Sequence, residues 1–286
     1  MKISTEINSI AKHVGEREAI VLCAKAGFDG WDFSMFQMVN YQWGLNTCEP
    51  TDHPLSGSGY LQFARELRKI GEDHGIRCNQ SHAPFPLCCQ EIYDLMPRAI
   101  ECTAEAGGEI CIIHPDNNKT PEENAEMYWK WLPFAKACGV KIATENMWNW
   151  DQATGYSSFA ACSTSESFCK HLETVNDDFL VACLDIGHAE MQGSGSGAVN
   201  MIHALGSKLQ ALHIHDNDRR HDSHQIPYSM DIDFDAVVKA LKDIGYSGWF
   251  TLEADQYLRD FHTSNVFEGV QNLASAAKKL AQMYEG

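Results

Sequence analysis

Short apolar runs alternate with longer amphipathic segments along the whole chain. The short runs are typical of buried strands, and the longer segments repeat apolar residues at the spacing of a helix. Strands are expected at Lys2–Ser4, Phe28–Ser34, Ile76–His82, Glu109–His114, Val140–Glu145, Phe179–Asp185, Leu209–His213 and Trp249–Glu253. Helices are expected at Glu16–Ala26, Gly59–His74, Glu91–Ala106, Pro121–Cys138, Ser165–Val175, Ala198–Leu205, Asp235–Ile244 and Val266–Tyr284. Most of these helices are followed directly by glycine, a residue that commonly ends helices.

Eight strand–helix units in succession predict an α/β fold in which a parallel sheet closes into a single (β/α)8 TIM barrel. A chain of 286 residues is long enough to bury a full core, so one domain over residues 1–286 is expected. Two connections, residues 36–58 and 148–164, are too long to be simple turns. Because both follow strands, they are expected on the C-terminal face of the barrel, where barrel enzymes carry their active sites.

Composition narrows the class of protein. No apolar run approaches the ~18 residues of a membrane span, and the N-terminus lacks the apolar stretch of a signal peptide, so we expect a cytoplasmic protein that does not enter membranes. The eleven cysteines are an odd number without a CxxC pair, which indicates reduced thiols. A formal net charge of −17 disfavours nucleic acid as a partner. A phosphorylated substrate would need a local basic pocket.

Acidic residues and histidines close four consecutive strands in the second half of the chain. These strands end at Glu145, at Asp185, at His213-Ile-His215 and at Glu253. Any one carboxylate there has a simple explanation as the cap of the next helix, but all four strand ends share one rim of the barrel. Three carboxylates gathered at one rim would repel each other unless a cation neutralised them. Oxygen ligands with one imidazole suit Mn, Mg, Co or Zn, so we expect one divalent metal ion.

The motifs at these strand ends resemble those of a known superfamily. They are Thr144-Glu145-Asn146, Leu184-Asp185-Ile-Gly-His188, His213-Ile-His-Asp216 and Leu252-Glu253. They are similar to the sugar phosphate isomerase/epimerase superfamily, which has a xylose isomerase-like barrel and includes ketose 3-epimerases and inosose-type isomerases and dehydratases. The resemblance implies that the metal ligands are Glu145, Asp185, His213 and Glu253. It selects His213 over His215, two residues that spacing alone leaves equivalent. It also implies that His188 and Arg219 contact the substrate.

The resemblance further implies a mechanism of proton transfer next to a carbonyl in a small carbohydrate or polyol. The metal would polarise the carbonyl and stabilise an enediolate, while Glu145 and Glu253 remove and return the proton. Return to the same carbon gives an epimerase, and return to the neighbouring carbon gives an isomerase. The same residues therefore do not choose between the two. A metal-dependent lyase or dehydratase of the superfamily is an alternative.

Further histidines and tryptophans are candidates for contacts with the substrate. His82 and His114, with the Asp222-Ser-His224 motif, resemble positions that hold extra zinc ions in apurinic endonucleases of the endonuclease IV type. The acidic charge and the absence of Lys/Arg enrichment in residues 36–58 argue against that activity. We expect His82 and His114 to line the substrate pocket instead. Trp148 is expected to stack on the substrate, although tryptophans in the long connections would equally suit a subunit contact in a homo-oligomer.

Overall fold

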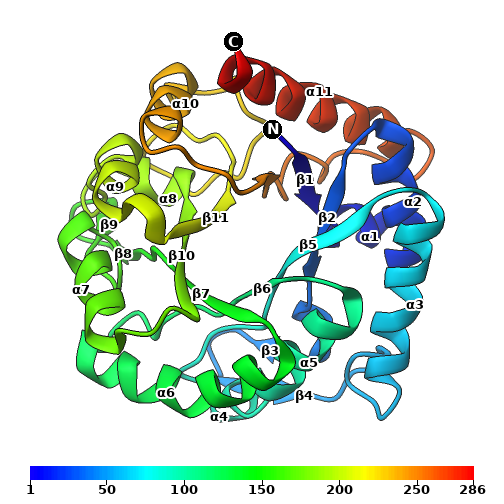
Figure 1. Cartoon of the computed structure of the whole chain (residues 1–286), viewed down its shortest axis with the longest axis horizontal. Coiled ribbons are helices and arrows are strands. Elements are labelled where there is room, and N and C mark those ends of the chain that lie inside the picture. Colours follow the sequence, from blue (N-terminus) through cyan, green and yellow to red (C-terminus); the bar gives the residue numbers. More distant parts are fainter.

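A computed structural model describes residues 1–286, and eight parallel strands form its central barrel (Figure 1). The strands are β1 (Ile3–Glu6), β2 (Gly30–Ser34), β5 (Arg77–His82), β6 (Ile110–Ile112), β7 (Lys141–Glu145), β10 (Leu180–Asp185), β11 (Leu209–His213) and β12 (Phe250–Leu252). Their order in the sheet is β11-β10-β7-β6-β5-β2-β1-β12. An isolated parallel bridge between Ile214 and Leu252 joins β11 to β12. The predicted TIM barrel is therefore confirmed.

Helices surround the barrel and connect its strands (Figure 1). The longer ones are α2 (Glu16–Ala26), α3 (Tyr60–Asp73), α5 (Met96–Ala106), α6 (Pro121–Cys138), α7 (Ser165–Val175), α9 (Ala198–Leu205), α10 (Phe234–Asp243) and α11 (Val266–Glu285). The shorter ones are α1 (Asn8–Val14), α4 (Gln90–Tyr93), α8 (Ile186–Glu190), η1 (Phe36–Met38) and η2 (Gly206–Lys208). Local sequence explains the bounds of α6, because Thr120 and Glu123 form a capping box at its start and Gly139 adopts a φ of 70° after its end.

Two packing regions hold the fold together. The larger, of 71 buried residues, lies between the sheet and the helices and includes Trp31, Tyr128 and Phe168. The smaller lies inside the barrel and consists of Ile112, Ala143, Val181, Cys183 and Ala211. The rest of the interior is polar, with buried Asp32 and Gln80 joined by a 2.8 Å hydrogen bond from the Gln80 amide. A buried charge of this kind needs partners, and the partners of Asp32 include a residue of the site described below.

The structure adds elements that the sequence pattern did not predict. The connection after β2 contains a hairpin of β3 (Asn40–Gln42) and β4 (Thr47–Glu49), and the connection after β7 contains a hairpin of β8 (Asn149–Asp151) and β9 (Tyr156–Ser158). The helix expected at Glu91–Ala106 is two helices, α4 and α5. Pro97 explains this break, because proline has no N–H and its ring would clash with the carbonyl of Tyr93 in a continuous helix. The α1 and α8 helices were not predicted.

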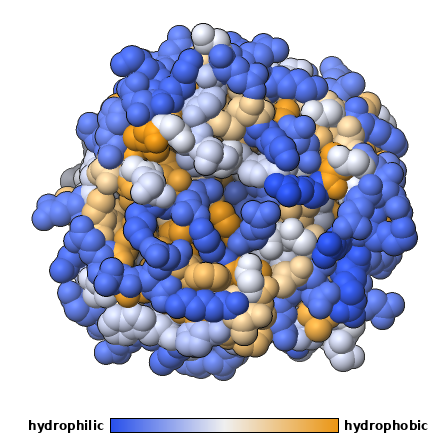
Figure 2. All heavy atoms as spheres, in the orientation of Figure 1, coloured by the Kyte–Doolittle hydropathy of each residue, from blue (hydrophilic) through white to orange (hydrophobic).

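The visible surface is mostly hydrophilic. Figure 2 shows hydrophilic residues over most of the visible periphery, with apolar residues gathered around a hollow near the centre of this face. None of the helices combines the length and the apolar character that crossing a bilayer requires.

Candidate metal centre and active site

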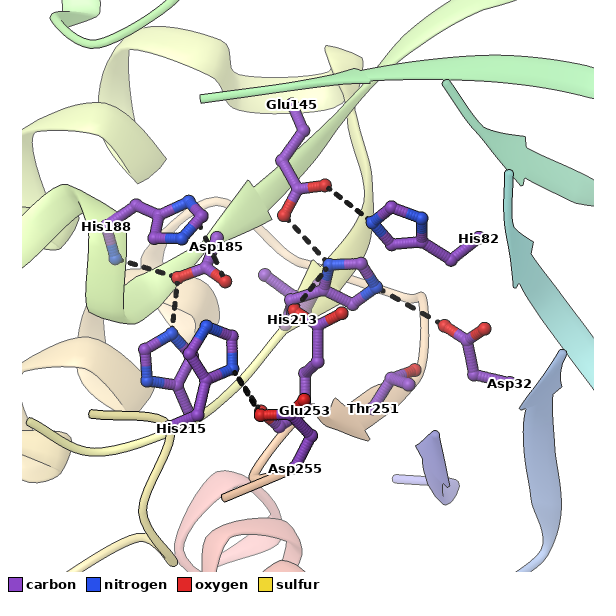
Figure 3. A network of polar contacts seen from close by, with 12 residues as sticks. Asp32, His82, Glu145, Asp185, His188, His213, His215, Thr251, Glu253 and Asp255 are labelled. Atoms are coloured by element: carbon purple, nitrogen blue, oxygen red, sulfur yellow. Dashed lines mark hydrogen bonds and ion pairs between the residues drawn. The ribbon is translucent and has the colours of Figure 1, made fainter. Parts of the chain in front are cut away.

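Three of the predicted metal ligands meet at the carboxyl ends of β7, β11 and β12. The Nδ1 atom of His213 lies 2.8 Å from Glu145 Oε1 and 3.2 Å from Glu253 Oε2. All three residues are buried, and their side chains point toward one another (Figure 3). Asp185, the fourth predicted ligand, lies at the same rim but makes its polar contacts to His188 and His215. Strand ends far apart in the sequence thus bring Glu145, His213 and Glu253 together, while Asp185 lies at the same rim against His188 and His215.

Asp32 holds the far side of the His213 ring. The Nε2 atom of His213 lies 3.3 Å from Asp32 Oδ2, and both side chains are fully buried. A carboxylate at this nitrogen holds the proton on Nε2 and fixes the ring with Nδ1 facing Glu145 and Glu253, where Nδ1 can bind a cation that displaces its own proton. Histidines that bind metals are usually held in this way. Asp32 was not identified from the sequence.

Burial and neighbouring charges shift the pKa values of the two glutamates in opposite directions. Burial alone raises the pKa of Glu145, but the adjacent His213 and His114 outweigh this effect and hold it well below its usual range. Burial raises the pKa of Glu253 well above its usual range, and the negative charge of Glu145 adds to the effect. Burial lowers the pKa of His213, but the neighbouring acidic groups, including both glutamates, reverse the shift and raise it well above normal. The centre is therefore a set of strongly interacting charges.

The donor set fits a divalent cation. Carboxylate oxygens and one imidazole suit the hard or borderline cations expected from the sequence. The fully buried Oδ2 atom of Asp185 has no hydrogen-bond partner, and buried oxygens of this kind are rarely left unpaired. A cation at this rim would provide the missing interaction and reduce the repulsion among the three carboxylates.

A second cluster lies next to the first. The Oδ2 atom of Asp222 is 3.2 Å from the Nε2 atoms of both His188 and His224. The ring of His215 stacks on His224 with 3.8 Å between centroids, and its Nε2 lies 3.1 Å from Asp185 Oδ1. The resemblance selected His213 over His215, and the structure places both rings at the site, each against a different carboxylate. The Oδ1 atom of Asp222 has no hydrogen-bond partner.

A cavity of about 570 Å³ opens above both clusters. Its lining includes Glu145, Glu253, His82, His114, His188 and Trp148, as well as Asp222 and His224. His114 Nε2 lies 3.1 Å from Glu145 Oε2, and His82 Nε2 lies 3.7 Å from the same oxygen. Trp148 donates from its indole nitrogen to Asp222 at 3.3 Å. The histidines and the tryptophan proposed from the sequence as substrate contacts therefore all reach the cavity.

Arg219 lies elsewhere. Its guanidinium pairs with Glu190 at 2.6 Å, nearly half of its side chain is exposed, and it does not line the cavity. Its backbone has a φ of 62°, in the left-handed region. The nearby Asp216 accepts hydrogen bonds from the backbone N–H groups of Asn217, Met230 and Ile232, so it fixes the loop that follows β11.

The sequence as a whole matches a known family. A family model described as a xylose isomerase-like TIM barrel covers residues 20–282. The chain belongs to this family. It is 27% identical over 255 residues to the uncharacterized protein MJ1311 of Methanocaldococcus jannaschii, covering 83% of this chain and 78% of that one. It is also 38% identical over 203 residues to the uncharacterized protein y4fM of Sinorhizobium fredii, covering 67% of this chain and 58% of that protein.

Solved structures of the same fold include carbohydrate epimerases. An IolI protein with a bound zinc atom aligns with a TM-score of 0.72 at 20% identity, over 99% of both chains. L-ribulose 3-epimerase aligns with a TM-score of 0.70 at 17% identity, over 100% of this chain and 95% of that one. The 3-keto-D-glucoside 4-epimerase YcjR of E. coli aligns with a TM-score of 0.68 at 14% identity, over 99% of both chains. At these identities the likeness establishes the shared fold.

Proposed function

We propose that this protein is a divalent-metal-dependent isomerase or epimerase that acts on a small carbohydrate or polyol by proton transfer next to a carbonyl. One observation carries the proposal: Glu145 and Glu253 flank the Nδ1 atom of His213 at the floor of a cavity. Two carboxylates around one position can remove a proton from one face of a carbon and return it from another. Membership of a family with epimerases among its structural relatives supports the same reaction class.

Glu145, Asp185, His213 and Glu253 are the residues proposed to hold the metal, which would be Mn, Zn, Mg or Co. When bound, the cation would supply Lewis acidity, polarising the carbonyl and stabilising the negative charge that follows deprotonation. The unpaired oxygen of Asp185, the orientation of His213 and the zinc atom in the IolI structure support this assignment.

The protein's own groups divide the acid–base work. Glu145 lies against His213 and His114, and Glu253 lies against His213, so the two carboxylates can serve as base and acid at one carbon of a substrate in the cavity. His188 lies between the two clusters, where its Nδ1 donates to the Asn146 carbonyl oxygen at 2.9 Å and its Nε2 lies 3.2 Å from Asp222 Oδ2. Since the carbonyl only accepts, Nδ1 donates and Nε2 faces the carboxylate. His188 is thereby positioned to orient a hydroxyl of the substrate.

The test is incorporation of solvent deuterium. Metal-loaded protein would be incubated in D2O with free ketoses, aldoses and inososes, and proton NMR would detect exchange at the carbon next to the carbonyl. We expect exchange with at least one of them, and a loss of about 100-fold or more in Glu145→Gln and Glu253→Gln, in line with the typical contribution of acid–base groups. Glu109→Gln, a change at the opposite end of the barrel, is the matched control. Cleavage of abasic DNA without deuterium exchange would indicate an endonuclease instead.

A further inference from the structure

The cavity is larger than a single sugar ring requires. Its volume of about 570 Å³ lies within the ~300–1,000 Å³ of pockets that hold drug-sized ligands. A hexose, with six carbons and six oxygens, is much smaller than such a ligand. One sugar ring placed against Glu145 and Glu253 therefore fills only the floor and leaves the outer part of the cavity open.

Aromatic rings connect the floor of the cavity to its mouth. The His114 ring, 3.1 Å from Glu145, lies 4.8 Å from the Phe85 ring between centroids. The Phe85 ring lies 6.2 Å from the Trp43 ring. All of these residues line the cavity. Phe85 therefore contacts both rings, and a continuous aromatic surface runs from His114 beside Glu145 to Trp43, which suits a molecule longer than one sugar ring.

The mouth presents a large exposed aromatic surface. Trp43 lies at the tip of the β3–β4 hairpin and is 71% exposed, and Tyr41 packs its ring edge-on at 4.9 Å. Exposure of an indole to water is unfavourable, and a flat apolar face laid on it would recover part of that cost. Leu45, on the same hairpin, is similarly exposed but does not line the cavity. Trp43 is therefore distinguished from its neighbour by its position over the site.

The charges around the cavity exclude a phosphorylated substrate. No lysine or arginine lines it, whereas Asp116 and Asp255 do. Lys119 pairs with the lining residue Asp116 at 3.3 Å, which offsets its charge, and Arg219 pairs with Glu190 outside the lining. A phosphate would meet carboxylates without a cationic side chain to bind it. Carboxylate and amide groups suit the hydroxyls of a neutral carbohydrate.

We propose that the substrate is an unphosphorylated keto-glycoside, in which a second ring with a flat apolar face is joined to the reacting sugar and stacks on Trp43. This inference rests on the proposed function. A glycosidic bond locks the anomeric carbon, so the carbonyl must stand at another ring carbon. One glutamate takes the proton from the carbon beside that carbonyl, and a proton returns to the same carbon or to the neighbouring carbonyl position. The glycosidic bond stays intact when the proton comes from the carbon on the side of the carbonyl away from the anomeric carbon, because the aglycone is then not β to the carbanion; no oxidant or reductant is needed.

The experiment compares matched probes. Metal-loaded protein would be given the methyl and phenyl 3-keto-β-D-glucosides, a 3-keto disaccharide, a free ketohexose and a ketohexose 6-phosphate, and deuterium uptake would be followed by NMR. We expect kcat/KM to be about 3- to 10-fold higher for the phenyl than for the methyl glycoside, the value of one aromatic contact. The disaccharide distinguishes a sugar ring from an aryl ring as the second group. Trp43→Ala should bring the phenyl-to-methyl ratio close to one, while Leu45→Ala keeps it.

A second measurement tests contact between the second ring and Trp43 independently of the reaction. Saturation-transfer NMR with phenyl β-D-glucoside, which has no keto group, should show contact to the phenyl protons in wild type and a loss in Trp43→Ala. Deuterium exchange on free ketoses without a phenyl preference, or a preference for the phosphate, would overturn the inference and leave the proposed function standing. Equal effects of Trp43→Ala and Leu45→Ala, with a change in sedimentation, would overturn it by identifying a subunit contact. Failure of exchange with every probe would refute the proposed function and the inference together.

Discussion

The interaction between Asp32 and His213 makes a precise prediction about metal affinity. The Asp32 carboxylate accepts from His213 at 3.3 Å and from Gln80 at 2.8 Å, with its Oδ2 atom shared between them. In Asp32→Asn the amide oxygen can keep both hydrogen bonds, but the negative charge is lost and an NH2 group replaces Oδ1, which has no partner. The Nδ1 atom of His213 then donates its electron pair to a cation less strongly, and the proton on Nε2 is less firmly held.

Losses of such carboxylates usually reduce metal affinity by about 10- to 100-fold, or about 1.4 to 2.7 kcal/mol. We expect Asp32→Asn to fall within this range while the fold is retained. Competition with a chelating dye for Zn²⁺ would measure the affinity, and ¹⁵N NMR of the imidazole would report whether Nε2 of His213 keeps its proton in the zinc-bound protein. Asp29→Asn, an exposed change just before the same strand, is the control. Unchanged affinity in Asp32→Asn, with a large loss in His213→Gln, would show that Asp32 does not orient the ligand.

Three further predictions concern stability. Protein in the presence of cation at 100 times its Kd should lose about 2.7 kcal/mol of its free energy of unfolding when a chelator removes the cation. Chemical unfolding would measure this difference, and equal stability with and without cation would contradict the proposed centre. Burial, and then the charge of Asp255, raise the pKa of Glu6 to about 7, so its contribution to stability is fully present below about pH 4.5 and is lost as the pH rises through 7. The free energy of unfolding of Glu6→Gln, relative to that of wild type, should therefore rise by up to about 3 kcal/mol between pH 5 and pH 8. Parallel pH profiles of the two proteins would contradict this. A Cβ at Gly187 would lie 1.9 Å from His215 Cε1, so Gly187→Ala should cost about 1–3 kcal/mol in urea unfolding, and a neutral result would mean that the ring moves freely.

The sequence predicted those parts of the fold that local patterns control. The α6 and α7 helices have the predicted bounds because caps and a following Gly139 or Asn176 define their ends. The β3–β4 and β8–β9 hairpins escaped prediction because their strands are three residues long and mostly polar. Strands this short have no period long enough to recognise, and pairing across the turn forms them.

Some residues of the candidate site could likewise be placed from the sequence, and others could not. Glu145 and Glu253 could be placed at one rim from the sequence, since in a parallel barrel every strand ends on the same face. The role of Asp32 could not, because it depends on which side chains from β2 and β11 meet across the interior. Arg219 shows a different limit: a resemblance assigned it to the substrate, whereas in the structure its guanidinium pairs with Glu190. Substrate contact by Arg219 stays a prediction.

The closure of the barrel has a consequence for its mechanics. Between β11 and β12 the only pairing is the single bridge at Ile214, made by two backbone hydrogen bonds to Thr251 and from Glu253. This seam is the part of the wall with the least backbone support. His213 lies on one side of this seam and Glu253 on the other, so a cation bound to both would link the two strands. Cation binding would then stabilise the barrel wall, and the amide protons of Ile214 and Glu253 would exchange more slowly when the cation is bound.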